Sequence, residues 1–532
     1  MITRIFTLSF LILIVTISAR ASHNVVAYGA TPNDATDDTA AIQTTLNEAA
    51  AAGGGQVDIP SGIYITSDTL LIPSNVHVKG EGRGATIIRP TGGPYPGKVV
   101  NGAYVFASLA MVSVSRASVE SLTLDHATNQ TQANGIAITV DGTNTPSLYC
   151  TISDAEVLSF DSYQYLIWNH RGKHTKILNN YVDGGVPFYS PSSAQEGIEV
   201  FGGEDVLVQG NTVRNIGGNA LYVNPEALVG PVLGLIVLRN YINSAKTGIR
   251  MAAGSDIHGA QIKENQVLSP WEYGIAVTAS NGITVDDLQI SGNSVNGGLE
   301  GIRLIGEPGV IARTISFRNN HVTKAGGTAA GSIVLNYFDN VELDGNTVSD
   351  GAGHGIFASA CKNVTVTNNR VEAVQQIGIL IENSHSVVVK RNRLKDYNLA
   401  NNTSSGIYLP LTIKGIVRDN EFSVTNQSYA VNVPSAASDQ IVIADNDLLY
   451  KATFNPVFVN LGTNPNFGSM IFAANETSKT VTNTLVNRSS SIVISQISGA
   501  PLAYIVTQTN GAFTVSLNYY PPGGETLKWE IR

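Results

Sequence analysis

A short phrase, apolar-x-x-Asn-x-apolar, recurs through residues 177–448 and constrains the fold more than any other feature of the chain. The Asn residues of this phrase are Asn180, Asn211, Asn240, Asn265, Asn293, Asn320, Asn346, Asn369, Asn392, Asn420 and Asn446. Ten steps cover the 266 residues from the first to the last, so the mean period is about 27 residues, a length typical of solenoids. Strand-like segments punctuated by Gly and Asn, without helical periodicity, indicate a parallel β-helix.

The repeated Asn has a physical reason to recur. Each coil must turn sharply between strands, and Asn tolerates the left-handed backbone conformation better than most residues do. Stacked coils would also place the Asn side chains above one another, where their amides can hydrogen-bond along the stack. We therefore expect the residues from Asn211 to Asn446 to form a ladder at one turn of the coil.

A second phrase, x-Gly-Ile-x-apolar, lies before many of these Asn residues, as EGIEV, TGIRM, YGIAV, EGIRL, HGIFA, IGILI and SGIYL. Alternate residues of a strand face opposite sides. Ile198 and Val200 are therefore predicted to point into the coil. Glu199, Arg250 and Arg303 take the alternate position and are predicted to point out, which makes the outward row the place for chemistry.

Residues 1–21 have the pattern of a secretory signal peptide. Arg4 supplies the basic start, the apolar run 5–17 is too short to span a bilayer comfortably, and residues 19–21 form a small-x-small cleavage site. No later segment is long and apolar enough to span a membrane. We therefore expect an exported chain, secreted or periplasmic, without a membrane span after cleavage.

Three further segments are expected after the signal peptide. Residues 22–90 should form an N-terminal cap and the first strands, with a helix over about Thr39–Ala52 that ends at three glycines. This helix can cover the first coil, whose core and strand edges would otherwise be exposed. Residues 91–460 should form the β-helix, and residues 461–532 a small all-β domain.

The charge of the chain limits its partners. The formal net charge is −9, which argues against nucleic acid, because proteins that bind nucleic acid present basic surfaces. The total does not exclude an acidic polysaccharide, because local Arg clusters matter more than the sum.

The two cysteines, Cys150 and Cys361, are predicted to be reduced and buried. At least seven coil steps separate them. At about 4.8 Å per step the separation exceeds about 30 Å, which is far beyond the reach of a disulfide.

Three stretches near the N-terminus carry a family resemblance: VVAYGATPNDATDDTAAIQ, GGGQVDIPSGIYI and VKGEGRGATIIRP. With the repeats, over roughly residues 24–460, they resemble the pectate-lyase-like, rhamnogalacturonase/epimerase-type superfamily. The resemblance implies an all-β fold: a right-handed single-stranded parallel β-helix with a capping helix and a small C-terminal β domain. It also implies a polysaccharide partner and leaves monomer and homotrimer open. Members include lyases, hydrolases, epimerases and viral tailspikes, so the fold does not fix the reaction.

The catalytic motifs of well-known branches are missing. Polygalacturonase-type hydrolases would show Asn-Thr-Asp, Asp-Asp, Gly-His-Gly and Arg-Ile-Lys in order, and only Gly-His-Gly is present, at residues 353–355. The Asp-Pro-His signature of alginate epimerases and the Arg-x-Pro-x-x-Arg pattern of pectate lyases are absent. No catalytic residue is therefore carried over by motif.

Aligning the coils on the Gly-Ile phrase gives a candidate site. The outward row reads Trp168, Glu199, Tyr222, Arg250, Ala276, Arg303, Val334, Phe357, Leu380 and Tyr408. Beside it lie Tyr165, Glu196, Asn219, Thr247, Tyr273 and Glu300, and the next outward positions are His170 and Asn224. Ionisable and aromatic side chains crowd into the first six coils, as a sugar cleft requires, with aromatic faces for the rings and charges for carboxylates or catalysis. The alternative is a row of ordinary surface pairs.

Two roles are assigned within this row. The residues predicted to be catalytic are Arg250, Tyr222, Glu199 and His170. The residues predicted to bind substrate are Trp168, Glu196, Asn224, Tyr273, Glu300 and Arg303. A metal site is not identifiable, because no His or Cys cluster has ligand spacing, and Ca²⁺ held by scattered oxygens stays open.

The row favours β-elimination on a uronic acid over hydrolysis. Elimination needs the substrate carboxylate to be neutralised and a base to take the C5 proton. Arg250 can bind the carboxylate, Tyr222 or His170 can act as base, and Glu199 can orient a partner or bind a cation. Hydrolysis needs two carboxyl groups about 5–10 Å apart. Within the row Glu199 has no acidic partner in the two nearest coils, and Glu196, on the same coil, should project in a different direction. A glycoside hydrolase that borrows a loop carboxylate, and a non-catalytic polysaccharide-binding or tailspike-like adhesion protein, are the alternatives.

Overall fold

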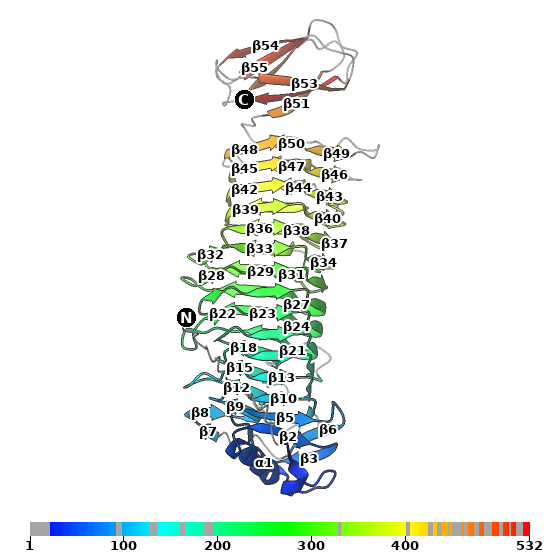
Figure 1. The fold of residues 1–532 in the computed structure, drawn as a ribbon. Helices are drawn as coiled ribbons and strands as arrows, with labels where there is room; N and C mark the ends of the chain where they lie inside the picture. The colour runs from blue at the N-terminus through cyan, green and yellow to red at the C-terminus, as the bar shows by residue number, and fades with distance from the viewer. Residues whose placement is uncertain are drawn as a thin grey trace, which may run out of the picture.

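The protein forms one long column of parallel strands, which the computed structural model shows as a stack of coils (Figure 1). The helix α1 (Thr39–Ala51) lies at one end of the column, and antiparallel strands lie at the other. The structure describes residues 22–531 apart from 92–97, 127–135, 160–164, 186–194, 328–330, 401–404, 424–428, 434–438, 445, 450–458, 462–466, 473–477, 483–491, 499–503, 510–511 and 518–524. The predicted right-handed parallel β-helix is confirmed, and the predicted signal peptide lies outside the described residues.

The strands of the column stack in three long parallel ladders. The first ladder contains β1 (Ser22–Asn24), β2 (Gly55–Ile59), β5 (Val76–Gly80), β10 (Ser118–Glu120), β13 (Thr151–Ser153), β16 (Lys176–Leu178), β20 (Leu207–Gln209), β23 (Ile236–Leu238), β26 (Gln261–Lys263), β29 (Gln289–Ser291), β33 (Ile315–Arg318), β36 (Val341–Asp344), β39 (Lys362–Thr367), β42 (His385–Lys390), β45 (Ile413–Arg418) and β48 (Asp439–Ala444).

The third ladder carries the Gly-Ile phrase and therefore the predicted site. It contains β4 (Leu70–Leu71), β9 (Ala107–Val112), β12 (Ile136–Asp141), β15 (Tyr165–His170), β18 (Glu196–Phe201), β21 (Thr212–Val223), β24 (Tyr241–Ala253), β27 (Gln266–Ala279), β31 (Glu300–Gly306), β35 (Gly331–Asn336), β38 (His354–Ser359), β41 (Ile379–Glu382), β44 (Ser405–Tyr408), β47 (Tyr429–Val433) and β50 (Val459–Leu461). Neighbouring strands of a ladder, called rungs below, lie about 4.8 Å apart.

The second ladder lies between the other two along each coil and follows the repeated Asn. It shares β21, β24 and β27 with the third ladder and also contains β3 (Gly62–Thr66), β6 (Thr86–Pro90), β11 (Thr123–Asp125), β14 (Glu156–Leu158), β17 (Tyr181–Asp183), β30 (Ser294–Asn296), β34 (His321–Thr323), β37 (Thr347–Ser349), β40 (Arg370–Glu372), β43 (Arg393–Lys395), β46 (Glu421–Ser423) and β49 (Asp447–Leu449).

Shorter elements complete the column and its ends. A fourth ladder contains β19 (Gly203–Glu204), β22 (Val232–Leu233), β25 (Ile257–His258), β28 (Thr284–Asp286) and β32 (Ile311–Arg313), and a hairpin joins β7 (Lys98–Val100) to β8 (Ala103–Val105). The antiparallel strands after β50 are β51 (Phe467–Phe472), β52 (Ser478–Thr482), β53 (Ile492–Ser498), β54 (Tyr504–Thr509), β55 (Ala512–Leu517) and β56 (Glu525–Ile531). The predicted domain boundaries stay predictions, and the ladders already begin with β1 and β3.

The helix α1 packs its apolar face onto the first coil. Ile42, Leu46 and Ala49 are buried and belong to the continuous core of the column. The Asp37 carboxylate accepts a hydrogen bond from the backbone N–H of Thr39 at 3.0 Å at the start of the helix. Together with the short 3₁₀ helix η1 (Val25–Tyr28), α1 therefore covers the end of the solenoid, as the sequence predicted.

The repeated Asn residues form the predicted ladder, which runs without a break from Asn180 to Asn446. Asn320 shows the pattern. Its Nδ2 donates to Oδ1 of Asn346 at 2.9 Å and to the carbonyl of Ile290 at 2.8 Å, and its Oδ1 accepts from both the backbone N–H and Nδ2 of Asn293. Each buried amide therefore has hydrogen-bond partners for its own polar atoms and supplies partners to backbone groups of the neighbouring coils, as buried polar groups require.

The left-handed turn residue is not the ladder Asn, which corrects the sequence interpretation. The residue directly before it takes the positive φ, as at Asn179, Arg239, Glu264 and Asn319. The ladder Asn is selected for its amide, which must lie inside the turn, and the left-handed step before it accepts several residue types.

The glycines of the second phrase permit close stacking of the coils. A Cβ on Gly248 would lie 2.5 Å from the carbonyl oxygen of Gly274, and one on Gly274 would lie 2.5 Å from that of Gly301. No larger residue fits at this corner without moving the next rung, which explains why Gly and Ile recur together.

The core inside the coils is apolar throughout. Ile198 and Val200 are buried as predicted. Cys150 and Cys361 are both free and buried, which confirms the expectation that they are not paired. No helix among the described residues has the length and apolar character needed to cross a membrane.

Replacing one ladder Asn tests this account of the fold. Asn320→Ala leaves the N–H and Nδ2 of Asn293 and the carbonyl of Ile290 without their partner, which should cost about 2–4 kcal/mol. The loss is measured as a lower midpoint of urea unfolding. Asn319→Gly keeps the positive φ at the neighbouring exposed position and should change the midpoint little. Equal losses in the two variants would contradict the role of the ladder.

Candidate functional site

The register of the third ladder places the outward row as the sequence alignment expected. Trp168 pairs with Glu199, Glu199 with Tyr222, and Tyr222 with Arg250. Arg250 continues to Ala276, and the row then reaches Arg303. The predicted residues therefore lie on consecutive rungs, although the roles assigned to them stay predictions.

The row is more covered than its outward direction suggests. Glu199 and Ala276 are each 2 % exposed, and Val334 and Leu380 are also buried. These side chains point away from the core of the coil, but neighbouring parts of the chain cover them. The candidate site is therefore a place of low water content, in which charge is expensive.

Two glutamates of β18 are buried side by side at this site. Glu196 accepts hydrogen bonds from the backbone N–H of Asn219 at 2.7 Å and from its Nδ2 at 3.0 Å. Burial raises the pKa of Glu196 to about 8, although these bonds and Arg250 lower it. The carboxyl group therefore keeps its proton at neutral pH.

The same physical effect raises the pKa of Glu199. Burial raises the pKa of Glu199 well above its usual value, repulsion from Glu196 and Glu226 raises it further, and a hydrogen bond from Asn224 lowers it. Its Oε2 has no hydrogen-bond partner among the described residues. A carboxyl group whose pKa is raised by burial holds its proton more strongly, and with one oxygen free of partners in the described part of the chain it is suited to donate that proton.

The outward row itself gives Glu199 no acidic partner, but two carboxyl groups outside the row lie near it. Glu196 lies close enough to raise its pKa, and so does Glu226 from the loop after β21. The alignment of strands missed Glu226 because this residue follows the strand, at a position that no repeat fixes. Two other carboxyl groups that the sequence offers for hydrolysis, Glu272 and Asp256, have basic partners of their own: Glu272 lies 3.7 Å from Lys246, and Asp256 lies 4.0 Å from His258.

Tyr222 and Arg250 form a pair on adjacent rungs. The Cζ of Arg250 lies 5.6 Å from the centroid of the Tyr222 ring. Burial raises the pKa of Tyr222 to about 12, against the lowering effect of Arg250. No carboxylate lies within ion-pair distance of Arg250 in the part of the chain that the structure describes. The guanidinium group is thus available for an anionic ligand.

The aromatic side chains at one end of the row stack on one another, which limits the ring faces that a sugar can reach. The Trp168 ring lies between Tyr165, at 5.9 Å, and His170, at 4.7 Å, and is stacked on both. Phe201 closes the group at 5.3 Å from His170. A sugar can therefore meet the edges of these rings and the outer face of Tyr165, which is 41 % exposed.

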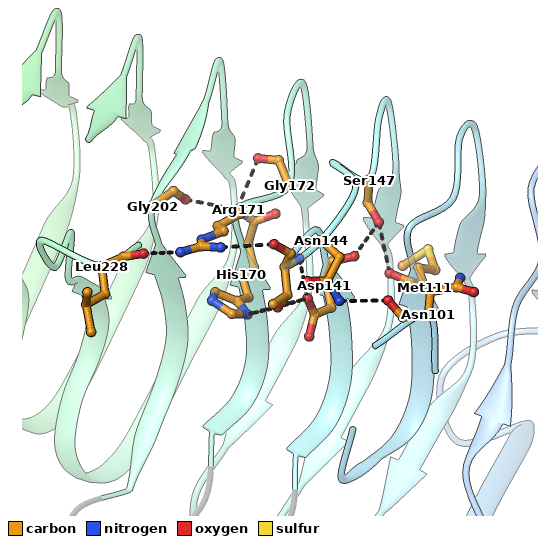
Figure 2. Close-up of polar contacts among 12 residues, drawn as sticks. Asn101, Met111, Asp141, Asn144, Ser147, His170, Arg171, Gly172, Gly202 and Leu228 are labelled. Atoms are coloured by element: carbon orange, nitrogen blue, oxygen red, sulfur yellow. Dashed lines mark hydrogen bonds and ion pairs between the residues drawn. The ribbon is translucent and has the colours of Figure 1, made fainter. Parts of the chain in front are cut away.

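His170 is paired with an aspartate that the sequence analysis missed (Figure 2). Its Nδ1 lies 3.4 Å from Oδ1 of Asp141 and 2.9 Å from Oγ1 of Thr143. Burial alone would raise the pKa of Asp141, but hydrogen bonds from His170 and Thr143 lower it, so this carboxylate is ionised. Asp141 pairs in register with His170, and extending the alignment by one coil would have found it.

The far end of the site is a compact group of three predicted residues. Arg303 donates from Nη1 to the Tyr273 hydroxyl at 2.7 Å and lies 3.6 Å from a carboxylate oxygen of Glu300. Burial raises the pKa of Glu300, and Arg303 lowers it. The charge of Arg303 is therefore partly neutralised by the protein, whereas that of Arg250, two rungs away, is not.

The site residues come together in two groups rather than in one cleft. Glu196, Glu199, Tyr222, Asn224 and Arg250 lie on consecutive rungs with Trp168 and His170 at one side. Asn224 reaches Glu226, with Nδ2 at 3.4 Å from Oε1. Three or more His, Cys, Asp or Glu side chains do not converge on a metal-sized space anywhere in the described residues, and Ca²⁺ stays a prediction without test.

Comparison with known proteins gives a family match over most of the column. A family model described as a right handed beta helix region matches residues 108–290 and 283–412. Mannuronan C5-epimerase AlgE1 of Azotobacter vinelandii is 44 % identical over 78 residues, 13 % of this chain and 6 % of the epimerase. Alginate lyase 7 of the same organism is 43 % identical over 74 residues, 13 % of this chain and 9 % of the lyase. The matched segments thus span less than a tenth of either relative.

A solved structure supports the fold over nearly the whole chain. A tailspike protein mutant of E. coli bacteriophage HK620, in complex with a pentasaccharide, superposes with a TM-score of 0.62. It is 13 % identical, and the superposition covers 96 % of this chain and 93 % of the tailspike chain. At this identity the likeness concerns the fold alone.

The buried acids predict how stability depends on pH. The pKa of Glu196 is raised by folding, so its contribution to stability is complete below about pH 4.5 and is lost as pH rises through about 8. Thermal unfolding of the wild type should therefore move to lower temperature across this window. Glu196→Gln should flatten the dependence, because an amide carries no proton to lose.

Glu264→Gln serves as the control for this measurement, because Glu264 lies on the surface in an ion pair with Arg239. It should leave the slope of melting temperature against pH unchanged. A wild-type melting temperature that stays constant from about pH 5 to about pH 8 would contradict the assignment of a buried, protonated Glu196.

Proposed function

We propose that this chain, which belongs to the right handed beta helix family, is an enzyme that cleaves a uronic-acid-containing polysaccharide by β-elimination. The observation that carries the proposal is the run of Glu199, Tyr222 and Arg250 on three consecutive rungs. A neutral acid, a phenol and an unpaired guanidinium group are the three functions that this reaction requires.

Each member of this run has a distinct part in the proposed step. Arg250 binds the substrate carboxylate with its planar fork and stabilises the negative charge that develops there. The phenolate form of Tyr222 takes the proton from C5. The C5–H electron pair forms the C4=C5 double bond, the C4–O4 bond breaks, and Glu199 gives its proton to the departing oxygen.

The position of Tyr222 between the other two groups supports this assignment. The base must reach the carbon next to the carboxylate that Arg250 holds, and Tyr222 is the neighbour of Arg250 along the row. His170 lies two rungs farther from Arg250 than Tyr222 does. We therefore assign Tyr222 as the base and place His170, with Asp141, at a sugar-binding position.

The relatives that match over short segments support the same chemistry. Epimerisation at C5 and elimination across C4 and C5 both begin with removal of the C5 proton, and the names mannuronan C5-epimerase and alginate lyase denote these two reactions. The matched segments are short, so the polymer and the outcome after proton removal belong to the proposal.

Arg250→Ala should lower turnover at least about tenfold, because a charge-assisted hydrogen bond contributes about 1.5–3 kcal/mol. Arg250→Lys should restore only part of the rate, since an ammonium group cannot reproduce the planar fork. The rate is followed as ultraviolet absorbance of the C4=C5 bond on a panel of uronic-acid and neutral polysaccharides. Arg239→Ala, on the surface, should turn over like the wild type. If Arg250→Ala keeps full turnover on every substrate, the row is not the site.

Tyr222→Phe should lower turnover by about a hundredfold or more, the usual effect of losing a positioned base. Tyr408→Phe is the matched control, because Tyr408 lies on the same outward row far from Arg250. The wild-type rate should also rise with pH from neutral, because the fraction of Tyr222 without its proton grows tenfold per unit below its pKa of about 12. The rise should level off where Glu199 loses its own proton.

A second candidate, hydrolysis, is favoured by one observation. Glu199 is buried and neutral, whereas Glu226 is exposed, and the two are close enough to interact. An acid and a carboxylate with such different surroundings form the pair that glycoside hydrolases use. In that reaction Glu199 protonates the leaving oxygen and Glu226 acts as base or nucleophile.

The two reactions are separated by product and by variant. Hydrolysis releases reducing ends without ultraviolet absorbance, and elimination gives both. Glu226→Gln should abolish hydrolysis and spare elimination, and Tyr222→Phe should have the opposite effect. Retained oligosaccharide binding without any turnover in the wild type would instead indicate an adhesion protein.

A further inference from the structure

Arg171, directly after His170, joins two loops that are far apart in sequence (Figure 2). Its Nη1 donates to the backbone carbonyl of Thr143 at 2.9 Å, in the loop after β12. Its Nη2 donates to the backbone carbonyl of Leu228, in the loop after β21. One guanidinium group therefore spans from the coil before its own to a loop that begins two coils after it.

The loop that Arg171 holds is residues 224–230, which carries Asn224 and Glu226. Backbone hydrogen bonds fix its two ends: Asn224 donates to the carbonyl of Val200 at 3.0 Å at the start, and just after the loop Val232 donates to the carbonyl of Asp256 at 3.0 Å. The Leu228 side chain is 89 % exposed, so it adds almost no packing. Val229 of this loop lies beside Gly202 of the column, and the contact from Arg171 adds a side-chain hydrogen bond to the backbone at the middle of the loop.

The backbone position of Arg171 is unusual for an arginine. It is left-handed, with a φ of 56°, at a turn step that Ser113 takes two coils earlier and Gly202 takes one coil later, with φ values of 54° and 71°. A left-handed conformation is unfavourable for a residue that carries a Cβ. At Arg171 it accompanies the two side-chain hydrogen bonds to the carbonyls of Thr143 and Leu228.

We propose that Arg171 is a positioning residue, which clamps the loop of residues 224–230 against the column and thereby holds Asn224 and Glu226 beside Glu199. Asn224 hydrogen-bonds with Glu199, and Glu226 lies near enough to repel its charge. A loop that moved away would remove both influences from the proposed acid. The catalytic meaning of the clamp rests on the proposed function, whereas the clamp itself does not.

Hydrogen exchange measured by mass spectrometry tests the clamp without any substrate. In Arg171→Ala the amides of residues 226–230 should exchange at least about tenfold faster than in the wild type, because the middle of the loop is released. Arg171→Lys keeps a cation that can reach one carbonyl and should give an intermediate rate. Arg239→Ala removes another left-handed surface arginine and should leave exchange in this loop unchanged. Unchanged exchange in Arg171→Ala overturns the proposal.

Turnover and its pH dependence test the consequence for catalysis. In Arg171→Ala, kcat should fall by between about tenfold and a hundredfold, because Glu199 loses the hydrogen bond from Asn224 that helps to position it. The pH at which the rate levels off should shift, since Glu199 loses the influence of Asn224 and Glu226. Faster exchange with an unchanged kcat and pH profile would overturn the positioning role. A wild type that cleaves no polymer would overturn the proposed function, and exchange alone then decides for or against the clamp.

Discussion

The Asn ladder sets the geometry on which the rest of the molecule depends. Each amide accepts from one coil and donates to the next, so neighbouring coils must keep one register from Asn180 to Asn446. A slip of a single residue would leave buried donors and acceptors without partners, which is costly in an apolar interior. Because the first turn of every coil is fixed in this way, the strands of the third ladder also meet in register. Residues separated by more than twenty positions in sequence then stand on adjacent rungs.

Burial favours the protonated, neutral forms of the acidic groups at the candidate site. Glu196, Glu199 and Tyr222 all lie where water is scarce, and each favours its neutral form. Arg250 stays cationic in the same place, because a guanidinium group does not lose its proton in proteins. The result is a single positive charge beside proton donors. An anionic sugar gains from such a site, whereas a positively charged ligand would find no ionised carboxylate in the row to pair with.

The sequence predicted the repeats and the rows well, because both follow from periodicity. Asn211 to Asn446 and the outward row from Trp168 to Arg303 lie where the alignment put them. Burial was harder to foresee, since Glu199 is covered by segments that no period describes. Glu226 was missed because it lies in a loop, and the stacking of Trp168 between Tyr165 and His170 depends on side-chain rotamers. Asp141 was within reach of the alignment and was overlooked because it precedes the first coil considered.

The stacking of the coils also fixes the spacing of the side chains along the outward row. Glu199, Tyr222 and Arg250 belong to successive coils, so the distance between any two of them changes only in whole rungs. Gain or loss of one complete coil between Arg250 and Arg303 would change their separation by one rung. The pattern of hydrogen bonds in the ladder would stay the same. A lineage of such proteins can therefore match sugar chains of different spacing by duplicating coils, without redesigning a single contact in the core.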